Sequence, residues 1–230
     1  MRYKNLFFDL DDTLWAFSQN ARDTFEELYH KYNFNRYFDS FEHYYFLYQK
    51  RNVELWIQYG DGRITKEELN HQRFFYPLQS VGVTDEYLSK RYSEDFFACI
   101  PLKSGLMPHT KEVLDYLAPK YNMYILSNGF RELQSCKMNS SGINSYFKKV
   151  ILSEDIGLLK PRAEVFYFAL SATQSELRES LMIGDSWDAD IVGAHQVGIH
   201  QVYYNLSKRT KLPFEPTYII GDLKELLSFL

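Results

Sequence analysis

The sequence of 230 residues has little cysteine, no long apolar run and no strong excess of one charge. Its two cysteines, Cys99 and Cys136, are far apart and lack CxxC spacing. They predict two free thiols in a reducing compartment rather than a disulfide or a metal site. No apolar stretch approaches the ~20 residues of a membrane-spanning helix. The net charge of −4, without long runs of either sign, argues against nucleic-acid polymers and membrane surfaces as partners but permits a small anionic ligand.

The first residues, MRYKNLFFDLDD, also lack the pattern of a signal peptide, because their apolar run is short and an acidic cluster interrupts it. We therefore expect a cytoplasmic protein. Hydrophobic residues make up 45% of the chain and aromatic residues 17%. The chain can thus bury a large core, and its many rings need an explanation.

Six short apolar runs predict an α/β fold with a Rossmann-like, doubly wound parallel sheet. The runs show no alternation of polar and apolar residues, which is typical of parallel strands buried on both faces. From the second run onward, helical segments fall between them, and such alternation is typical of this fold. The strands are expected at 5–10, 123–128, 149–153, 180–185, 200–205 and 217–220, and the helices at 109–119, 130–140, 162–172, 188–197 and 222–229.

The segment between the first two strands contains no convincing strand and reads as four helices. Thr65 and Glu68 form a capping-box pattern at the start of the third. We therefore predict a core domain made of 1–15 and 96–230, interrupted by a helical insertion at 16–95. Much of the aromatic excess lies in this insertion, where we interpret most rings as packing and a minority as candidates for a binding site. The four helices are expected at 18–32, 40–59, 65–79 and 85–98.

Polar side chains follow the first strand in the sequence DLDDT. Residues two apart in an extended chain point the same way, so Asp9, Asp11 and Thr13 are expected to converge while Asp12 faces away. Two converging carboxylates need a cation or a bound proton, and Mg²⁺ is a suitable cation. The alternative is a solvated acidic loop. Asp12 is expected to be a loop residue without a catalytic role.

Two further polar groups follow later strands. Ser127, Asn128 and Gly129 stand between a strand and a helix, where a hydroxyl, an amide and a flexible backbone can bind an anion. Lys160, just before a proline, can supply a fixed positive charge. An ordinary strand-to-helix turn and a solvated lysine are the alternatives.

The segment MIGDSWDAD brings more acidic groups to the end of another strand. Asp185, with Asp188 or Asp190, could complete an oxygen-ligand metal site with the first cluster, whereas helix capping is the alternative. Together the strand ends offer carboxylates for a metal, donors for an anion and a balancing lysine. This combination suits phosphoryl transfer, which depends on positioning and electrostatic stabilisation.

These motifs, in this order, resemble those of the haloacid-dehalogenase-like (HAD) hydrolase superfamily over essentially the whole chain. The motifs are DLDDT, a serine ending the second strand, KP and GDSWDAD, and the helical insertion resembles a cap of the C1 type. The resemblance implies that Asp9 is a nucleophile that forms an aspartyl-phosphate and that Asp11 is the general acid/base.

The resemblance also implies roles for the remaining polar residues. Thr13 and Ser127 would hold phosphate oxygens, with backbone amides near Asn128 and Gly129, and Lys160 would balance charge. Mg²⁺ would bind Asp9, Asp185 and the main-chain carbonyl of Asp11. Asp190 would support that shell, with Asp188 as the competing candidate.

A closer resemblance is to nucleoside-monophosphate phosphatases with pyrimidine preference. It is carried by FDLDDTLWAFSQNARDTFEELY, LWIQYGDGRITKEELNHQRF and LSNGFRELQSCKM. Trp15 and Phe17 could then stack on a base, although packing at the hinge is an equal alternative. The resemblance implies a Mg²⁺-dependent phosphatase acting on a small phosphorylated metabolite, with a nucleoside 5′-monophosphate favoured. The alternatives are a phosphoglycolate or sugar-phosphate phosphatase, a phosphomutase, a dehalogenase or a non-catalytic binding module.

Overall fold

The structure, a computed structural model, describes residues 3–230 and divides the chain into two compact units. One unit comprises Met1–Phe17 and Ser104–Leu230, and the other comprises Ser18–Lys103. The predicted insertion, 16–95, therefore ends eight residues too early. The reason is that helix α4 (Glu86–Cys99) and the 3-10 turn Ile100–Leu102 continue the helical unit beyond residue 95.

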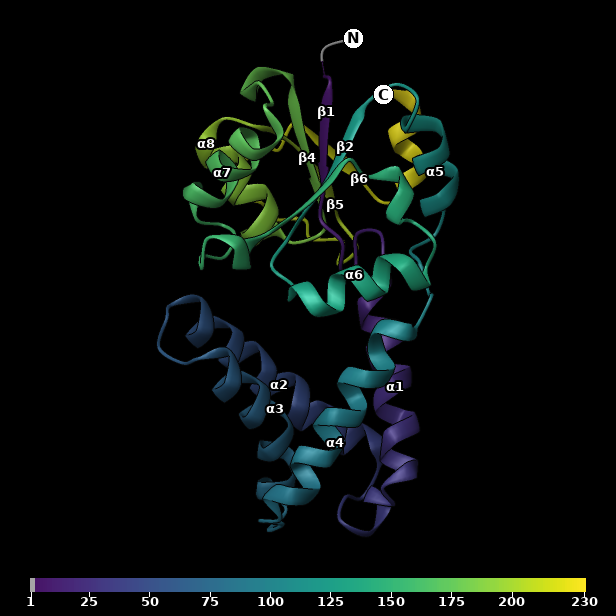
Figure 1. The fold of residues 1–230 in the computed structure, drawn as a ribbon, viewed down its shortest axis with the longest axis vertical. Helices are drawn as coiled ribbons and strands as arrows, with labels where there is room; N and C mark the ends of the chain where they lie inside the picture. The colour runs from purple at the N-terminus through teal and green to yellow at the C-terminus, as the bar shows by residue number, and fades with distance from the viewer. Residues whose placement is uncertain (1–2) are drawn as a thin grey trace. The chain divides into compact units, whose positions relative to one another are not determined.

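A six-stranded parallel sheet organises the first unit (Figure 1). The strand order is β3-β2-β1-β4-β5-β6, so the first strand of the sequence lies in the middle of the sheet. All four residues of β1 are buried, as expected for a strand covered on both faces. The strands are β1 (Asn5–Phe8), β2 (Asn122–Ser127), β3 (Lys149–Leu152), β4 (Ser180–Gly184), β5 (His200–Tyr204) and β6 (Tyr218–Ile220).

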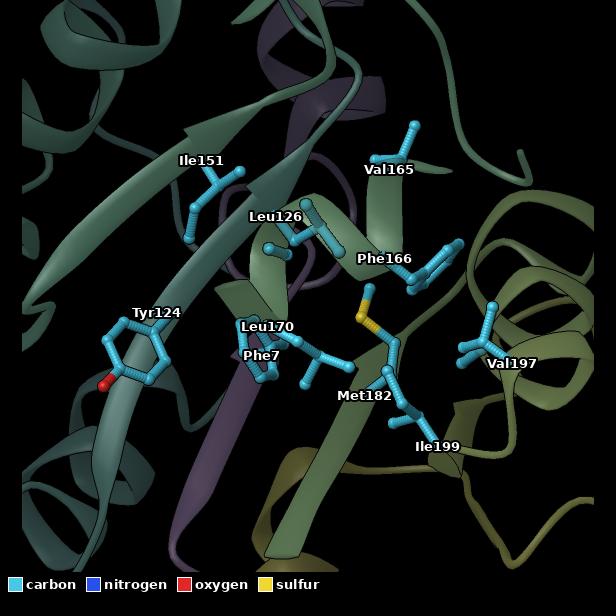
Figure 2. Packing of buried hydrophobic residues seen from close by; sticks show 12 residues of the cluster. Phe7, Tyr124, Leu126, Ile151, Val165, Phe166, Leu170, Met182, Val197 and Ile199 are labelled. Carbon is cyan, nitrogen blue, oxygen red and sulfur yellow. The ribbon is translucent and has the colours of Figure 1, made fainter. Parts of the chain in front are cut away.

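Helices cover both faces of this sheet (Figure 1). On one face, Phe7 of β1 and Met182 of β4 pack against Phe166 and Leu170 of α7, as Figure 2 shows. Each such buried side chain contributes roughly 1.5–3 kcal/mol. The helices of this unit are α5 (Thr110–Leu117), α6 (Arg131–Ser140), α7 (Ala163–Thr173) and α8 (Gly193–Val197), with a π-helical turn at Trp187–Val192 and a final 3-10 helix at Leu223–Ser228.

The helical unit is held together by aromatic side chains. The ring centroid of Phe25 lies 4.1 Å from that of Tyr48 and 4.4 Å from that of Phe96. Phe34 stacks on Tyr92 with 4.8 Å between centroids. These rings are buried, so they are packing residues. Its helices are α1 (Phe17–Lys31), α2 (Phe41–Gly60), α3 (Lys66–Ser80) and α4.

Several local predictions are confirmed. Thr65 and Glu68 form a complete capping box at the start of α3. Cys99 and Cys136 are both free thiols. Within residues 3–230, none of the helices combines the length and the apolar character needed to cross a bilayer.

Candidate active site

The predicted polar groups meet at the carboxyl ends of three adjacent strands. Asp9 directly follows β1, Ser127 is the last residue of β2, and Asp185 directly follows β4. Because β1 lies between β2 and β4 and all three run parallel, their carboxyl ends share one edge of the sheet. Ligands of open parallel sheets bind at this edge.

Lys160 joins two of the acidic motifs. Its Nζ donates hydrogen bonds to Asp9 Oδ1 at 2.8 Å, to Asp190 Oδ1 at 2.6 Å and to the carbonyl oxygen of Leu126 at 2.7 Å. Burial lowers the pKa of Lys160, but the carboxylates of Asp190 and Asp9 outweigh burial and leave this pKa above its ordinary value. Lys160 is therefore a buried, permanently charged ammonium group in the middle of the site, not a solvated lysine.

The segment that carries Lys160 is fixed by Asn128. The amide oxygen of Asn128 accepts from the Lys160 backbone N–H at 2.8 Å, and its Nδ2 donates to the Lys160 carbonyl at 3.1 Å. Ser153 Oγ also donates to that amide oxygen. An anion contact through the backbone amides near Asn128 stays a prediction, whereas the Asn128 side chain itself is engaged elsewhere. Its hydrogen-bonding groups are used to position Lys160.

Gly129 is required by close packing. A Cβ at this position would lie 2.1 Å from Gln134 Nε2. Its backbone N–H donates to Ser127 Oγ at 3.1 Å, and Gln134 Nε2 donates to the same hydroxyl oxygen at 2.7 Å. Ser127 is therefore oriented by two donors at the end of β2.

Asp9, Asp185 and Asp190 form a candidate metal centre. One carboxylate oxygen from each lies within 4.8 Å of the others. Gly184 permits this approach, since a Cβ there would lie 2.2 Å from Asp190 Oδ2. Asp188 is exposed, so Asp190 is the member of the predicted pair that the structure brings into the cluster. Three hard oxygen donors fit Mg²⁺.

The electrostatics of the cluster also fit a cation. Burial raises the pKa of Asp185 to about 7, and the charges of Asp190 and Asp12 add to this effect. Burial likewise raises the pKa of Asp9, despite the opposing influence of Lys160. A bound divalent cation would favour the ionised carboxylates and reverse both shifts.

Thr13 does not present a free hydroxyl to a phosphate. It is fully buried, its Oγ1 donates to Asp185 Oδ1 at 3.0 Å, and it accepts from the Asp185 backbone N–H at 3.1 Å. Thr13 thus positions Asp185, and its contact with a phosphate oxygen stays a prediction. Asp12 occupies a left-handed turn with φ of 56°, as a loop residue can.

Asp11 faces helix α6 instead of the three clustered carboxylates. Gln134 Nε2 donates to its Oδ2 at 2.9 Å, and Lys137 Nζ donates to its Oδ1 at 2.7 Å. β1 ends at Phe8, so Asp11 and Thr13 lie beyond the strand, but both stay near the cluster: the charge of Asp11 acts on Asp9, and Thr13 donates a hydrogen bond to Asp185. Neither Gln134 nor Lys137 was singled out from the sequence. Their spacing of three residues on a predicted helix is the one signal that places them on a common face.

The Trp15 side chain follows the packing alternative in this structure. It is 0% exposed, and Lys137 Nζ lies 4.7 Å from the centroid of its ring. The same ammonium group lies 5.2 Å from the Phe17 ring. Trp15 is thus a packing residue beside Lys137 and is not accessible for stacking on a base in this structure.

Comparisons with known proteins agree with this geometry. Residues 3–198 match the family model described as haloacid dehalogenase-like hydrolase. The chain belongs to this family. As a HAD hydrolase it is an enzyme, and its parallel sheet with flanking helices is the fold of that family.

Several similar proteins match nearly the whole chain. The pyrimidine 5′-nucleotidase YjjG of Escherichia coli is 28% identical, covering 100% of this chain and 99% of its own. The pyrimidine 5′-nucleotidase PynA of Streptococcus pneumoniae is 30% identical, covering 100% and 96%. A crystal structure of the putative HAD-hydrolase YfnB from Bacillus subtilis bound to magnesium superposes with a TM-score of 0.89 at 26% identity, covering 99% of this chain and 98% of that one. Haloacid dehalogenases also superpose, at 22% identity or less, which shows a shared fold alone.

Proposed function

We propose that this HAD hydrolase is a Mg²⁺-dependent phosphatase that cleaves small phosphomonoesters through an aspartyl-phosphate on Asp9. The observation that carries the proposal is the group of three acidic side chains, Asp9, Asp185 and Asp190, with the buried ammonium of Lys160 between two of them. Such a site can hold a cation and a phosphate dianion next to a carboxylate nucleophile.

The reaction divides into two displacements at phosphorus. A carboxylate oxygen of Asp9 forms a bond to phosphorus while the bond from phosphorus to the ester oxygen breaks, and a proton moves from Asp11 to that leaving oxygen. A water molecule then attacks the phosphorus of the aspartyl-phosphate and gives its proton to Asp11. The bond between phosphorus and Asp9 breaks, which releases inorganic phosphate and restores both carboxyl groups.

The surrounding residues hold this site in place. Asp9, Asp185 and Asp190 would hold Mg²⁺, which supplies positive charge to the nonbridging phosphate oxygens. Lys160 keeps Asp9 in position by a hydrogen bond and compensates negative charge. Ser127, at the end of β2, offers its hydroxyl to a phosphate oxygen.

We further propose a nucleoside 5′-monophosphate as the substrate. Two full-length relatives, YjjG and PynA, are named pyrimidine 5′-nucleotidases, and this chain matches each from end to end. The presence of Asp11, with two donors ordering its carboxylate, favours ester hydrolysis over cleavage of a carbon–halogen bond.

The direct test is phosphate release from a panel containing dUMP, dTMP, UMP, phosphoglycolate and sugar phosphates, with Mg²⁺ or with EDTA. We expect turnover of the nucleotides that EDTA abolishes and that Asp9→Asn lowers at least about a thousandfold. Asp188→Asn is the matched control, because this aspartate is exposed in the same acidic segment. Full activity of Asp9→Asn, or halide release without phosphate release, would contradict the proposal.

A further inference from the structure

We propose that Gln134 and Lys137 of helix α6 are positioning residues that hold Asp11 for proton transfer to the leaving group. This inference rests on the proposed phosphatase function and adds two residues to it. It is based on hydrogen bonds that link Asp11 and the Ser127 hydroxyl to two side chains of helix α6.

The two donors hold both oxygens of the Asp11 carboxylate. Gln134 Nε2 lies 2.9 Å from Oδ2, and Lys137 Nζ lies 2.7 Å from Oδ1. Two donors on different oxygens fix both the rotation of the carboxylate and its distance from the helix. A carboxylate has about four lone-pair sites, so each oxygen keeps one that can carry the transferred proton.

Gln134 also connects Asp11 to the end of β2. The same Nε2 donates to Ser127 Oγ at 2.7 Å, and the Gln134 side chain is fully buried. One amide group therefore sets the position of Asp11 relative to the Ser127 hydroxyl, to which the proposed function assigns a phosphate oxygen. The absence of a side chain at Gly129 makes room for this amide.

Lys137 is confined by aromatic rings. Its side chain is 4% exposed, and its ammonium group lies 4.7 Å from the Trp15 ring and 5.2 Å from the Phe17 ring. A cation over aromatic faces is stabilised there while its hydrogen bonds remain directed at Asp11. The pair is only partly buried, since 27% of the Asp11 side chain is exposed, and such pairs contribute little net stability, so an orienting role accounts for it better than a stabilising one.

The test compares two esters whose leaving groups differ in their need for a proton. The leaving group of a nucleoside 5′-monophosphate is a basic alkoxide, which needs a proton. The leaving group of p-nitrophenyl phosphate is a stable phenolate, which does not. The ratio kcat/KM covers the steps up to the first phosphoryl transfer, where leaving-group protonation occurs. We expect Lys137→Met to lower kcat/KM for the nucleotide about 10- to 100-fold, which is a partial loss of the roughly 100- to 10,000-fold that a general acid contributes, and to affect the nitrophenyl ester much less.

Two variants serve as internal controls. Lys137→Arg keeps a cationic donor and is expected to restore most of the nucleotide activity. Ser135→Ala changes an exposed residue of the same helix and is expected to leave both esters unaffected. An equal loss on both esters, or no loss on either, would overturn the inference.

A crystal structure of Lys137→Met tests the positioning without turnover. We expect the Asp11 carboxylate to leave its present position or to occupy several. An Asp11 side chain that keeps its position would overturn the inference. If the wild-type protein releases phosphate from neither ester, the phosphatase proposal fails, and this structure still decides whether Lys137 positions Asp11.

Discussion

The ammonium group of Lys160 lies 2.8 Å from the Oδ1 of Asp9, a residue 151 positions earlier in the chain. The same group lies 2.6 Å from Asp190 Oδ1. Lys160 therefore makes the acidic end of the sheet compatible with burial, because one cation is shared by two carboxylates that would otherwise repel each other.

Replacing Lys160 by methionine should damage both stability and turnover. The variant leaves Asp9 and Asp190 buried without their cation, and breaking a buried pair in this way costs about 3–5 kcal/mol. We expect urea denaturation to show this loss in the metal-free protein, and phosphate release to fall at least about a hundredfold through lost charge stabilisation. Lys111→Met, at an exposed position, is the control. Wild-type turnover by the Lys160→Met protein would show that this lysine takes no part in catalysis.

Gly184→Ala should weaken Mg²⁺ binding and also disturb the buried pair between Asp190 and Lys160. The added Cβ would lie 2.2 Å from Asp190 Oδ2, so the carboxylate must move away from Lys160 and from the other two aspartates. We expect a loss of Mg²⁺ affinity of about 10- to 100-fold by titration calorimetry, the size expected for disturbed outer contacts of a metal site. Gly221→Ala is the control, because its nearest new contact is an ordinary 3.7 Å. Equal affinities of the two variants would show that Asp190 does not support the metal.

The positions of the strands and of one helix cap were largely predictable from the sequence. Strands buried on both faces leave uninterrupted apolar runs such as NLFFDL, and a strand of the structure overlaps each of the six predicted runs. The cap of helix α3 was predictable because Thr65 and Glu68 act within one turn. Such signals are local, so they can be read without knowledge of tertiary contacts.

The tertiary partners of the site were less predictable. Alternation along the chain grouped Asp9, Asp11 and Thr13, but it could not name their partners, which are α6 for Asp11 and Asp185 for Thr13. The contact between Lys137 and Asp11 joins residues 126 positions apart, and no local pattern encodes such a pair. The burial of Trp15 likewise depends on neighbours that fold next to it.

Mg²⁺ should stabilise the protein more at pH 8 than at pH 5. Without metal, burial, with the charges of Asp190 and Asp12, raises the pKa of Asp185 in the folded state to about 7, above the 3.8 of an unburied aspartate. The folded protein then keeps a proton that the unfolded chain releases, so its free energy of unfolding decreases as pH rises from about 4 to about 7. A bound cation stabilises the ionised Asp185 and so restores the lost free energy of unfolding. At pH 8 no proton on Asp185 has to be displaced before the cation binds.

Thermal denaturation with Mg²⁺ or EDTA at the two pH values measures the difference. At a Mg²⁺ concentration of 100 Kd the gain is about 2.7 kcal/mol, which corresponds to a Tm increase of roughly 5–10 °C at pH 8. The increase should be much smaller at pH 5. Asp185→Asn should lose most of the gain at pH 8. A gain that is equal at both pH values, or that survives in Asp185→Asn, would place the cation elsewhere.

Phe25→Ala should destabilise the helical unit Ser18–Lys103. Phe25 is fully buried, and its ring packs against Tyr48 of α2 and Phe96 of α4. Removing a buried phenylalanine side chain costs about 3–5 kcal/mol through lost burial and the cavity that remains. Phe46→Ala removes the same atoms from a side chain that is 62% exposed, so it should change the free energy of unfolding by less than about 0.5 kcal/mol. Urea denaturation followed by tyrosine fluorescence compares the two variants. Equal losses would mean that the aromatic cluster around Phe25 is not the core of this unit.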